Sequence, residues 1–278
     1  MSAAIEAARP VNDEPRSGDF ISDDGLRLRW YRWGDEADPV PVVLHHGFAA
    51  SSDSNWLATG IVDALRRAGR SVVSLDARGH GRSDAPHDPE RYGEARMALD
   101  LRALIDRLGI RAFDLFGYSM GAVVSLLVAS SDRRVRRLIV GGVGEGVLKS
   151  GGVDLRVMQR EAIIAALLTD DPASITHPGV ALFRSFAEYT GSDLRALAAQ
   201  AMRMHDAPIA LDAIACPALV LAGQDDILAA NIEALAAALP EASSARMPGG
   251  HLDAVRDPRF AELATRFLGE ASRTPSNP

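Results

Sequence analysis

The hydrophobic positions of this chain alternate between short continuous runs and longer stretches with helical spacing. Six short apolar runs predict β-strands at 26–33, 40–44, 72–75, 112–116, 135–143 and 218–221. Five longer patterns predict helices at 57–68, 92–108, 120–129, 232–239 and 260–268. Several strands are almost entirely apolar, which is typical of strands buried on both faces of a parallel sheet. The pattern therefore predicts one α/β domain with helices on both sides of the sheet.

A long stretch before the last predicted strand breaks this alternation. Residues 145–215 carry three helical patterns and no convincing strand, with Pro and Gly turn signals between the patterns: 155–168, 180–189 and 194–204. An insertion in an open α/β sheet is expected over the carboxyl ends of the strands, where ligands bind. We therefore expect a helical cap at 145–215. The remainder divides into a core that carries the sheet and two flexible tails: core 18–144 and 216–270, tails 1–17 and 271–278.

Composition narrows the functional classes. Apolar residues make up 47% of the 278 residues, enough for a large core. A net charge of −7 has the wrong sign for binding phosphate backbones or anionic lipid, so we expect neither a nucleic-acid nor a membrane partner. The single cysteine, Cys216, cannot form an internal disulfide, and no export signal or membrane span is recognisable. These features predict a cytoplasmic protein that acts on a small molecule, and they leave its oligomeric state open.

The most informative segment is a strand that runs into Gly117-Tyr118-Ser119-Met120-Gly121 and then into an apolar helix. A serine on such a sharp turn needs small neighbours two residues away on each side, because strand and helix approach closely there. Gly117 and Gly121 meet that need. The start of the helix also aims the Met120 N–H at the place where an oxyanion would form. This context predicts that Ser119 is a nucleophile.

A serine hydroxyl needs a base and an orienting acid, and the sequence offers both downstream. His251 follows a Pro-Gly-Gly turn, and Asp226 lies just past the predicted strand 218–221. Strand ends would bring both side chains to one rim of the sheet. The chain order Ser, Asp, His is the order used by α/β-hydrolases and differs from the orders in other serine hydrolases.

Four separated motifs together resemble the α/β-hydrolase superfamily over residues 18–268: His46-Gly47-Phe48, the run 76–83, the Ser119 turn, and Gly223 to Asp226 with Gly250-His251. The resemblance implies an α/β-hydrolase fold with a mostly parallel eight-stranded sheet, flanking helices and a helical cap insertion. It further implies that Ser119 attacks the substrate and that His251 acts as general base and then acid. Asp226 would orient the imidazole, and the backbone N–H groups of Phe48 and Met120 would form the oxyanion hole. No cofactor is implied.

Two other carboxylates compete for the role of the acid. Asp225 is adjacent to Asp226, but the acid of the family usually stands three residues after the glycine that ends the strand, which favours Asp226. Glu145 follows the strand 135–143, from which some relatives take their acid. We rank Asp226 first, Asp225 second and Glu145 third.

The adjacent pair His45 and His46 could suggest a metal site. No third ligand lies nearby in the sequence, and neighbouring strand side chains point to opposite faces. His46 is also explained by the oxyanion loop. We therefore expect no metal. By resemblance, His80 lies in a tight loop near that strand and has a structural role.

The cap supplies apolar side chains at helical spacing, and some of them should line a substrate pocket: Tyr118 from the core, with Met158, Phe183 and Phe186. The expected reaction is hydrolysis of a partly hydrophobic ester or lactone through an acyl-enzyme on Ser119. Other reactions of the same superfamily stay open, because the motifs do not separate them. These are hydrolysis of a carbon–carbon bond in a ring-cleavage-type diketone acid, a cofactor-free haloperoxidase reaction, and a receptor with vestigial activity.

Overall fold

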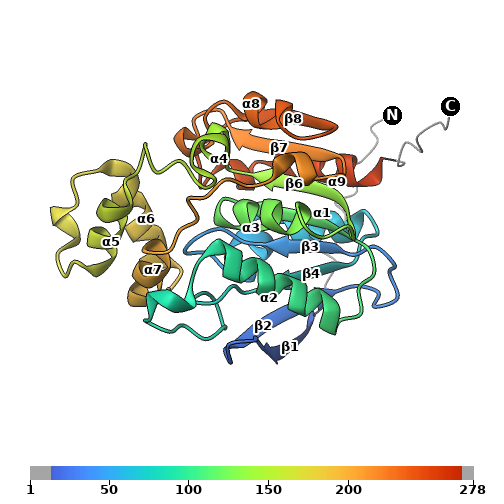
Figure 1. Ribbon diagram of the computed structural model, residues 1–278, viewed down its shortest axis with the longest axis horizontal. Coiled ribbons are helices and arrows are strands. Elements are labelled where there is room, and N and C mark those ends of the chain that lie inside the picture. Colours follow the sequence, from blue (N-terminus) through green and yellow to red (C-terminus); the bar gives the residue numbers. More distant parts are fainter. Residues whose placement is uncertain (1–13, 271–278) are drawn as a thin grey trace, which may run out of the picture.

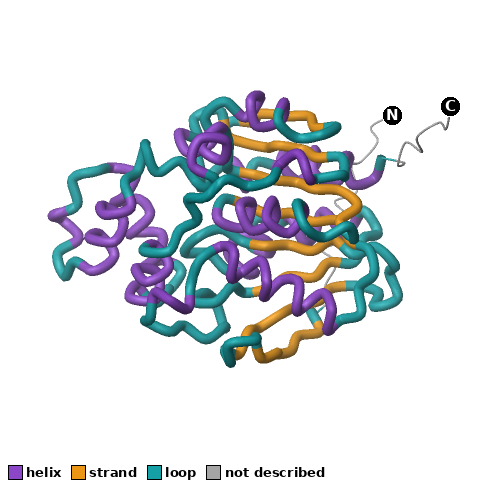
Figure 2. The backbone as a smooth tube through the Cα atoms, in the orientation of Figure 1, coloured by secondary structure: helices purple, strands orange, loops and turns teal. Residues whose placement is uncertain are grey.

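The computed structural model describes residues 14–270. A sheet of eight strands runs through the centre in the order β1-β2-β4-β3-β5-β6-β7-β8 (Figures 1 and 2). The strands are Arg16–Ile21 (β1), Arg27–Trp33 (β2), Val42–His45 (β3), Val72–Leu75 (β4), Phe113–Tyr118 (β5), Val135–Gly141 (β6), Ala218–Gly223 (β7) and Ala242–Met247 (β8). The pairings β1/β2 and β2/β4 are antiparallel, and the other five are parallel. This confirms the mostly parallel eight-stranded sheet.

Helices cover both faces of this sheet. The α-helices of residues 14–270 are Ile61–Arg67 (α1), Glu94–Arg107 (α2), Met120–Ala129 (α3), Glu145–Ser150 (α4), Arg160–Leu168 (α5), Pro178–Tyr189 (α6), Leu194–Ala201 (α7), Ile232–Ala237 (α8) and Pro258–Gly269 (α9). One apolar cluster joins α1 and α9 to one face of the sheet, and another joins α2, α3 and α8 to the other face. Within this described part, no helix is both long and apolar enough to cross a membrane.

The apolar strand runs are explained by burial on both faces. In β3, Val42 and Leu44 pack into the cluster with α1 and α9, whereas Val43 packs into the cluster with α2 and α3. All four residues of this strand are buried, because successive side chains point to opposite faces and helices cover each face. The carboxyl ends of the parallel central strands therefore lie side by side at one edge of a well-packed sheet.

The edge strand β1 was not predicted. Its sequence is mostly polar, and Phe20 is its one buried residue. Its first two residues, Arg16 and Ser17, pair with Arg32 and Tyr31 of β2, so the ordered chain begins before the predicted end of the tail at residue 17. The rest of the expected tails, at 1–13 and 271–278, lies outside the described residues.

The insertion between β6 and β7 contributes four helices. Figure 1 shows α5, α6 and α7 beyond the end of the sheet where the parallel strands finish. Within this group α5 packs against both α6 and α7. The first helix, α4, lies in the range expected for the cap, but it packs against α8 of the core. Its attachment begins at Glu145, whose backbone N–H donates to the Ala230 carbonyl at 2.8 Å.

Candidate active site

Ser119 occupies the turn between β5 and α3 in a strained backbone conformation. Its φ of 54° and ψ of −117° are rare for a residue with a side chain. The close approach of strand and helix explains the flanking glycines. A Cβ on Gly117 would lie 2.1 Å from the Gly121 carbonyl oxygen, and one on Gly121 would lie 1.9 Å from the His45 carbonyl oxygen. The turn therefore requires glycine at both positions.

His251 lies between Ser119 and Asp226. Its Nε2 is 2.9 Å from Ser119 Oγ, and its Nδ1 is 2.9 and 3.0 Å from the two carboxylate oxygens of Asp226. The Asp226 side chain is fully buried, and that of His251 is 8% exposed. Carboxylate oxygens accept hydrogen bonds, so the tautomer that fits both contacts has its N–H at Nδ1, and this N–H donates a hydrogen bond to Asp226. The lone pair of Nε2 then faces the Ser119 hydroxyl.

The two partners of Ser119 are each held by a second contact. Asp226 begins a short 3-10 turn after β7 and accepts a hydrogen bond from the Leu228 N–H at 3.0 Å. The Tyr118 hydroxyl donates to the His251 carbonyl oxygen at 2.6 Å, and the two rings lie 5.5 Å apart. Tyr118 therefore links the turn that carries Ser119 to the loop that carries His251.

The competing carboxylates lie elsewhere. The Asp225 side chain is exposed, although its neighbour is buried. Glu145 forms ion pairs with Lys149 at 2.6 Å and Arg156 at 3.0 Å, and these contacts lower the pKa of Glu145. The structure thus brings Asp226 to the imidazole and engages Glu145 with cations outside this hydrogen-bonded line.

The loop after β3 lies directly against the Ser119 turn. A Cβ on Gly47 would lie 3.3 Å from the Tyr118 carbonyl oxygen and 3.4 Å from Ser119 Cβ. The Gly47 N–H donates to Asn55 Oδ1 at 2.8 Å, which fixes the loop from its other side. Within residues 14–270, the N–H groups of Phe48 and Met120 donate to no protein acceptor. Both donors are therefore available to a ligand.

Three buried histidines support this loop. His46 Nδ1 is 2.8 Å from the Gly47 carbonyl oxygen, and its Nε2 accepts from the Ala77 N–H at 3.0 Å. The His80 ring lies 5.2 Å from that of His46. Burial lowers the pKa of both His45 and His80 to about 3, so both are neutral at physiological pH. Through its hydrogen bonds to Gly47 and Ala77, His46 links the loop after β3 to the loop after β4.

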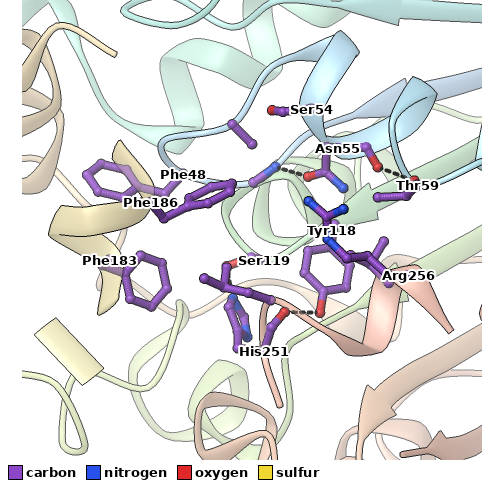
Figure 3. A pocket seen from close by; sticks show the side chains of 14 residues that line it. Phe48, Ser54, Asn55, Thr59, Tyr118, Ser119, Phe183, Phe186, His251 and Arg256 are labelled. Carbon is purple, nitrogen blue, oxygen red and sulfur yellow. Dashed lines mark hydrogen bonds between the residues drawn. The ribbon is translucent and has the colours of Figure 1, made fainter. Parts of the chain in front are cut away.

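Two cavities meet at Ser119. The first has an empty volume of about 410 Å³ and is lined in part by Phe48, Tyr118, Phe183, Phe186 and His251 (Figure 3). The second has an empty volume of about 440 Å³ and is lined in part by Phe48, Met120, Met158 and Phe183. All four residues expected in a substrate pocket therefore line one or both cavities. Phe183 and Phe186 reach the site from α6 of the insertion.

Several polar lining residues were not foreseen, and three of them bear on the chemistry of the cavities. Asn55 and Arg256 line the first cavity, and Glu94 lines the second. Arg256 lies five residues after His251, so its place on the same loop was a usable signal. Asn55 and Glu94 carry no motif, and Glu94 resembles an ordinary acidic residue in the first turn of a helix. In fact Glu94 is buried, and this burial raises its pKa to about 7.

Comparisons with known proteins agree with this architecture. A family model described as alpha/beta hydrolase fold matches residues 40–143. A solved hydrolase from Pseudomonas aeruginosa PA01 is 27% identical with a TM-score of 0.74, and the match covers 91% of this chain and 98% of that one. The chain belongs to the α/β-hydrolase superfamily.

The curated relatives match a smaller share of this chain than the solved hydrolase does. The sn-1-specific diacylglycerol lipase ABHD11 of Mus musculus is 40% identical over 108 residues, which are 38% of this chain and 33% of the relative. The putative carbamate hydrolase RutD of Klebsiella pneumoniae (strain 342) is 28% identical over 246 residues, or 78% of this chain and 87% of the relative. The match spans only 33 to 52% of the length of the first three curated relatives.

Proposed function

We propose that this protein is a serine hydrolase that cleaves a carboxylic ester or lactone through an acyl-enzyme on Ser119. The observation that carries the proposal is the hydrogen-bonded line from Asp226 through His251 to Ser119, which ends where two cavities meet. The likeness to a lipase and a putative carbamate hydrolase supports hydrolytic chemistry.

The proposed reaction has two halves. First, Ser119 Oγ attacks the carbonyl carbon while its proton moves to His251 Nε2, and the bond to the alcohol oxygen breaks as that oxygen takes the proton. Next, a water molecule gives a proton to Nε2 and attacks the acyl carbon, and the proton returns to Ser119 Oγ as the acid leaves. Asp226 stabilises the imidazolium in both halves.

The developing oxyanion would receive hydrogen bonds from the N–H groups of Phe48 and Met120. Each such donor contributes about 2.7–4 kcal/mol of transition-state stabilisation in comparable sites. The apolar lining of both cavities favours a substrate with hydrophobic portions of modest size.

A substrate panel tests this proposal. Wild type should hydrolyse 4-nitrophenyl butyrate, and Ser119→Ala and His251→Ala should each lose roughly 10³-fold or more in kcat. Circular dichroism should show both variants folded. Turnover of a vinylogous dienoic diketone acid without turnover of any ester would replace this proposal with carbon–carbon hydrolysis. Ligand binding that is equal in wild type and Ser119→Ala, without multiple turnover, would replace it with a receptor role.

A further inference from the structure

The first cavity is lined by a cation that takes no part in the hydrogen-bonded line from Asp226 through His251 to Ser119. Arg256 lines this cavity together with Ser119 and His251, and it is exposed. Within residues 14–270 no ion pair closer than 4.0 Å involves Arg256, whereas most arginines described here have a carboxylate partner. Among the residues that the structure describes, no carboxylate lines the cavity to neutralise this charge. A guanidinium in this setting is suited to a planar anion that enters with the substrate.

Asn55 adds a hydrogen-bond donor to the same wall. Its Oδ1 accepts from the Gly47 N–H, so the amide orientation is fixed and Nδ2 faces the other way. Nδ2 is buried and has no hydrogen-bond partner among the described residues. Buried amide donors are rarely left unpaired. In Figure 3 the Arg256 guanidinium points toward Asn55, so the two donors converge on one part of the cavity.

The second cavity differs from the first in its charge and its lining. The ionisable side chains that line it are Glu94 and Asp154, and its other lining residues are mainly apolar. Asp154 is already paired with Arg156, at 2.8 Å from Nε to Oδ1, and no cation from the described part of the chain lines this cavity. The second cavity therefore offers a carboxylate a mainly apolar lining, whereas the first offers it the Arg256 guanidinium. The first cavity is therefore suited to an anionic group of a ligand, and the second cavity to an apolar group.

We propose that the first cavity binds a carboxylate of the substrate, so that the substrate is an ester or lactone that bears a second, ionised carboxyl group. Arg256 pairs with both oxygens of that carboxylate, and Asn55 Nδ2 donates to one of them. The apolar remainder lies in the second cavity. This inference rests on the proposed function for the bond that is cleaved, but the anion site itself is independent of turnover.

Matched pairs of esters test the site. One pair places the charge on the acyl side, 4-nitrophenyl hydrogen glutarate against 4-nitrophenyl valerate. The other places it on the alcohol side, 4-acetoxybenzoate against its methyl ester. In at least one pair, Arg256→Gln should lower the ratio of kcat/KM for the charged over the neutral ester by 10- to 100-fold, mainly through KM. Arg256→Lys should retain part of the preference, because it keeps the charge and loses the bidentate geometry.

Arg133→Gln is the control for the loss of one positive charge. Arg133 is exposed in the turn between α3 and β6, at the opposite end of the strands, so its removal should leave both ratios unchanged. If Arg256→Gln changes neither ratio while neutral esters are still hydrolysed, the carboxylate site is wrong and the proposed function stands.

A binding measurement covers the case in which no ester is hydrolysed. Calorimetric titration of Ser119→Ala with each charged ester, 4-nitrophenyl hydrogen glutarate and 4-acetoxybenzoate, should show binding of at least one that weakens at least tenfold in the double variant Ser119→Ala/Arg256→Gln. Equal affinity of the two variants for both esters, or no binding of either ester, would overturn the carboxylate site. Tight binding without turnover in wild type would instead overturn the hydrolase.

Discussion

Replacing Gly121 with alanine tests the packing that raises Ser119 at the end of β5. The new Cβ would lie 1.9 Å from the His45 carbonyl oxygen and 2.6 Å from that of His46. An ordinary contact begins at 3.4 Å, so α3 and the end of β3 would have to separate by about 1.5 Å. Both atoms are backbone, so no side-chain rotation can relieve the clash.

The magnitude follows from two opposing effects. Alanine gains up to about 1 kcal/mol over glycine in a helix. Overpacking at a rigid site costs about 3 kcal/mol, the upper part of the usual range, because the contact is with backbone. The net loss in the free energy of unfolding is then about 2 kcal/mol, which lowers Tm by about 4–8 °C. The value of kcat should also fall, because the displaced carbonyls belong to the segment that leads into Phe48.

Thermal melting and ester kinetics measure both effects. Gly269→Ala is the matched control, since Gly269 ends α9 and a Cβ there meets no atom of residues 14–270 within 4 Å. The control should melt at or above the wild-type temperature. A Gly121→Ala protein that is as stable and as active as wild type would refute the packing argument.

Three further changes probe the acid, a buried carboxyl and the contact between insertion and core. Asp226→Asn should lower kcat by about 10⁴-fold through loss of the correct imidazole tautomer, whereas Asp225→Asn should stay near wild type; equal losses in steady-state assays would contradict this. Burial raises the pKa of Glu94 from 4.5 to about 7, so the unfolded chain releases this proton at a lower pH than the folded protein does. The free energy of unfolding should therefore fall by up to about 3 kcal/mol as the pH rises from 4.5 to 7. Urea titrations across pH should show this slope in wild type and not in Glu94→Gln. Thr190→Val removes the 2.9 Å hydrogen bond to the Ala49 carbonyl and should lower kcat about 2- to 10-fold with little change in KM; an equal rise in KM would point to substrate binding instead.

The sequence predicts best the elements whose burial is nearly complete. The bounds expected for α3 and β4 agree with the structure, because nine of the ten residues of α3 and all four of β4 are buried. The edge strands carry a weaker signal. In β1 one residue is buried, and β8 is mainly half-buried and polar, so neither forms an apolar run. Their pairing with a neighbour, and not their own hydrophobicity, determines these strands.

The residues of the candidate active site also differ in how well the sequence predicts them. Ser119, Asp226 and His251 stand at strand ends, where sequence order and spacing largely determine position. Asn55 and Arg256 reach the first cavity through the local path of a π-helical turn and of the loop after His251. That path depends on contacts that no spacing rule contains. Substrate preference is therefore much harder to predict from the sequence than the nucleophile.

Covalent labelling with a fluorophosphonate tests the central claim most directly, because this reagent reacts with a serine only where a neighbouring base activates it. Intact mass should show one adduct per chain, and peptide mapping should place it on Ser119. Labelling should be absent in Ser119→Ala and should slow by orders of magnitude in His251→Ala. An adduct on any other residue, or no adduct on folded wild-type protein, would contradict the account.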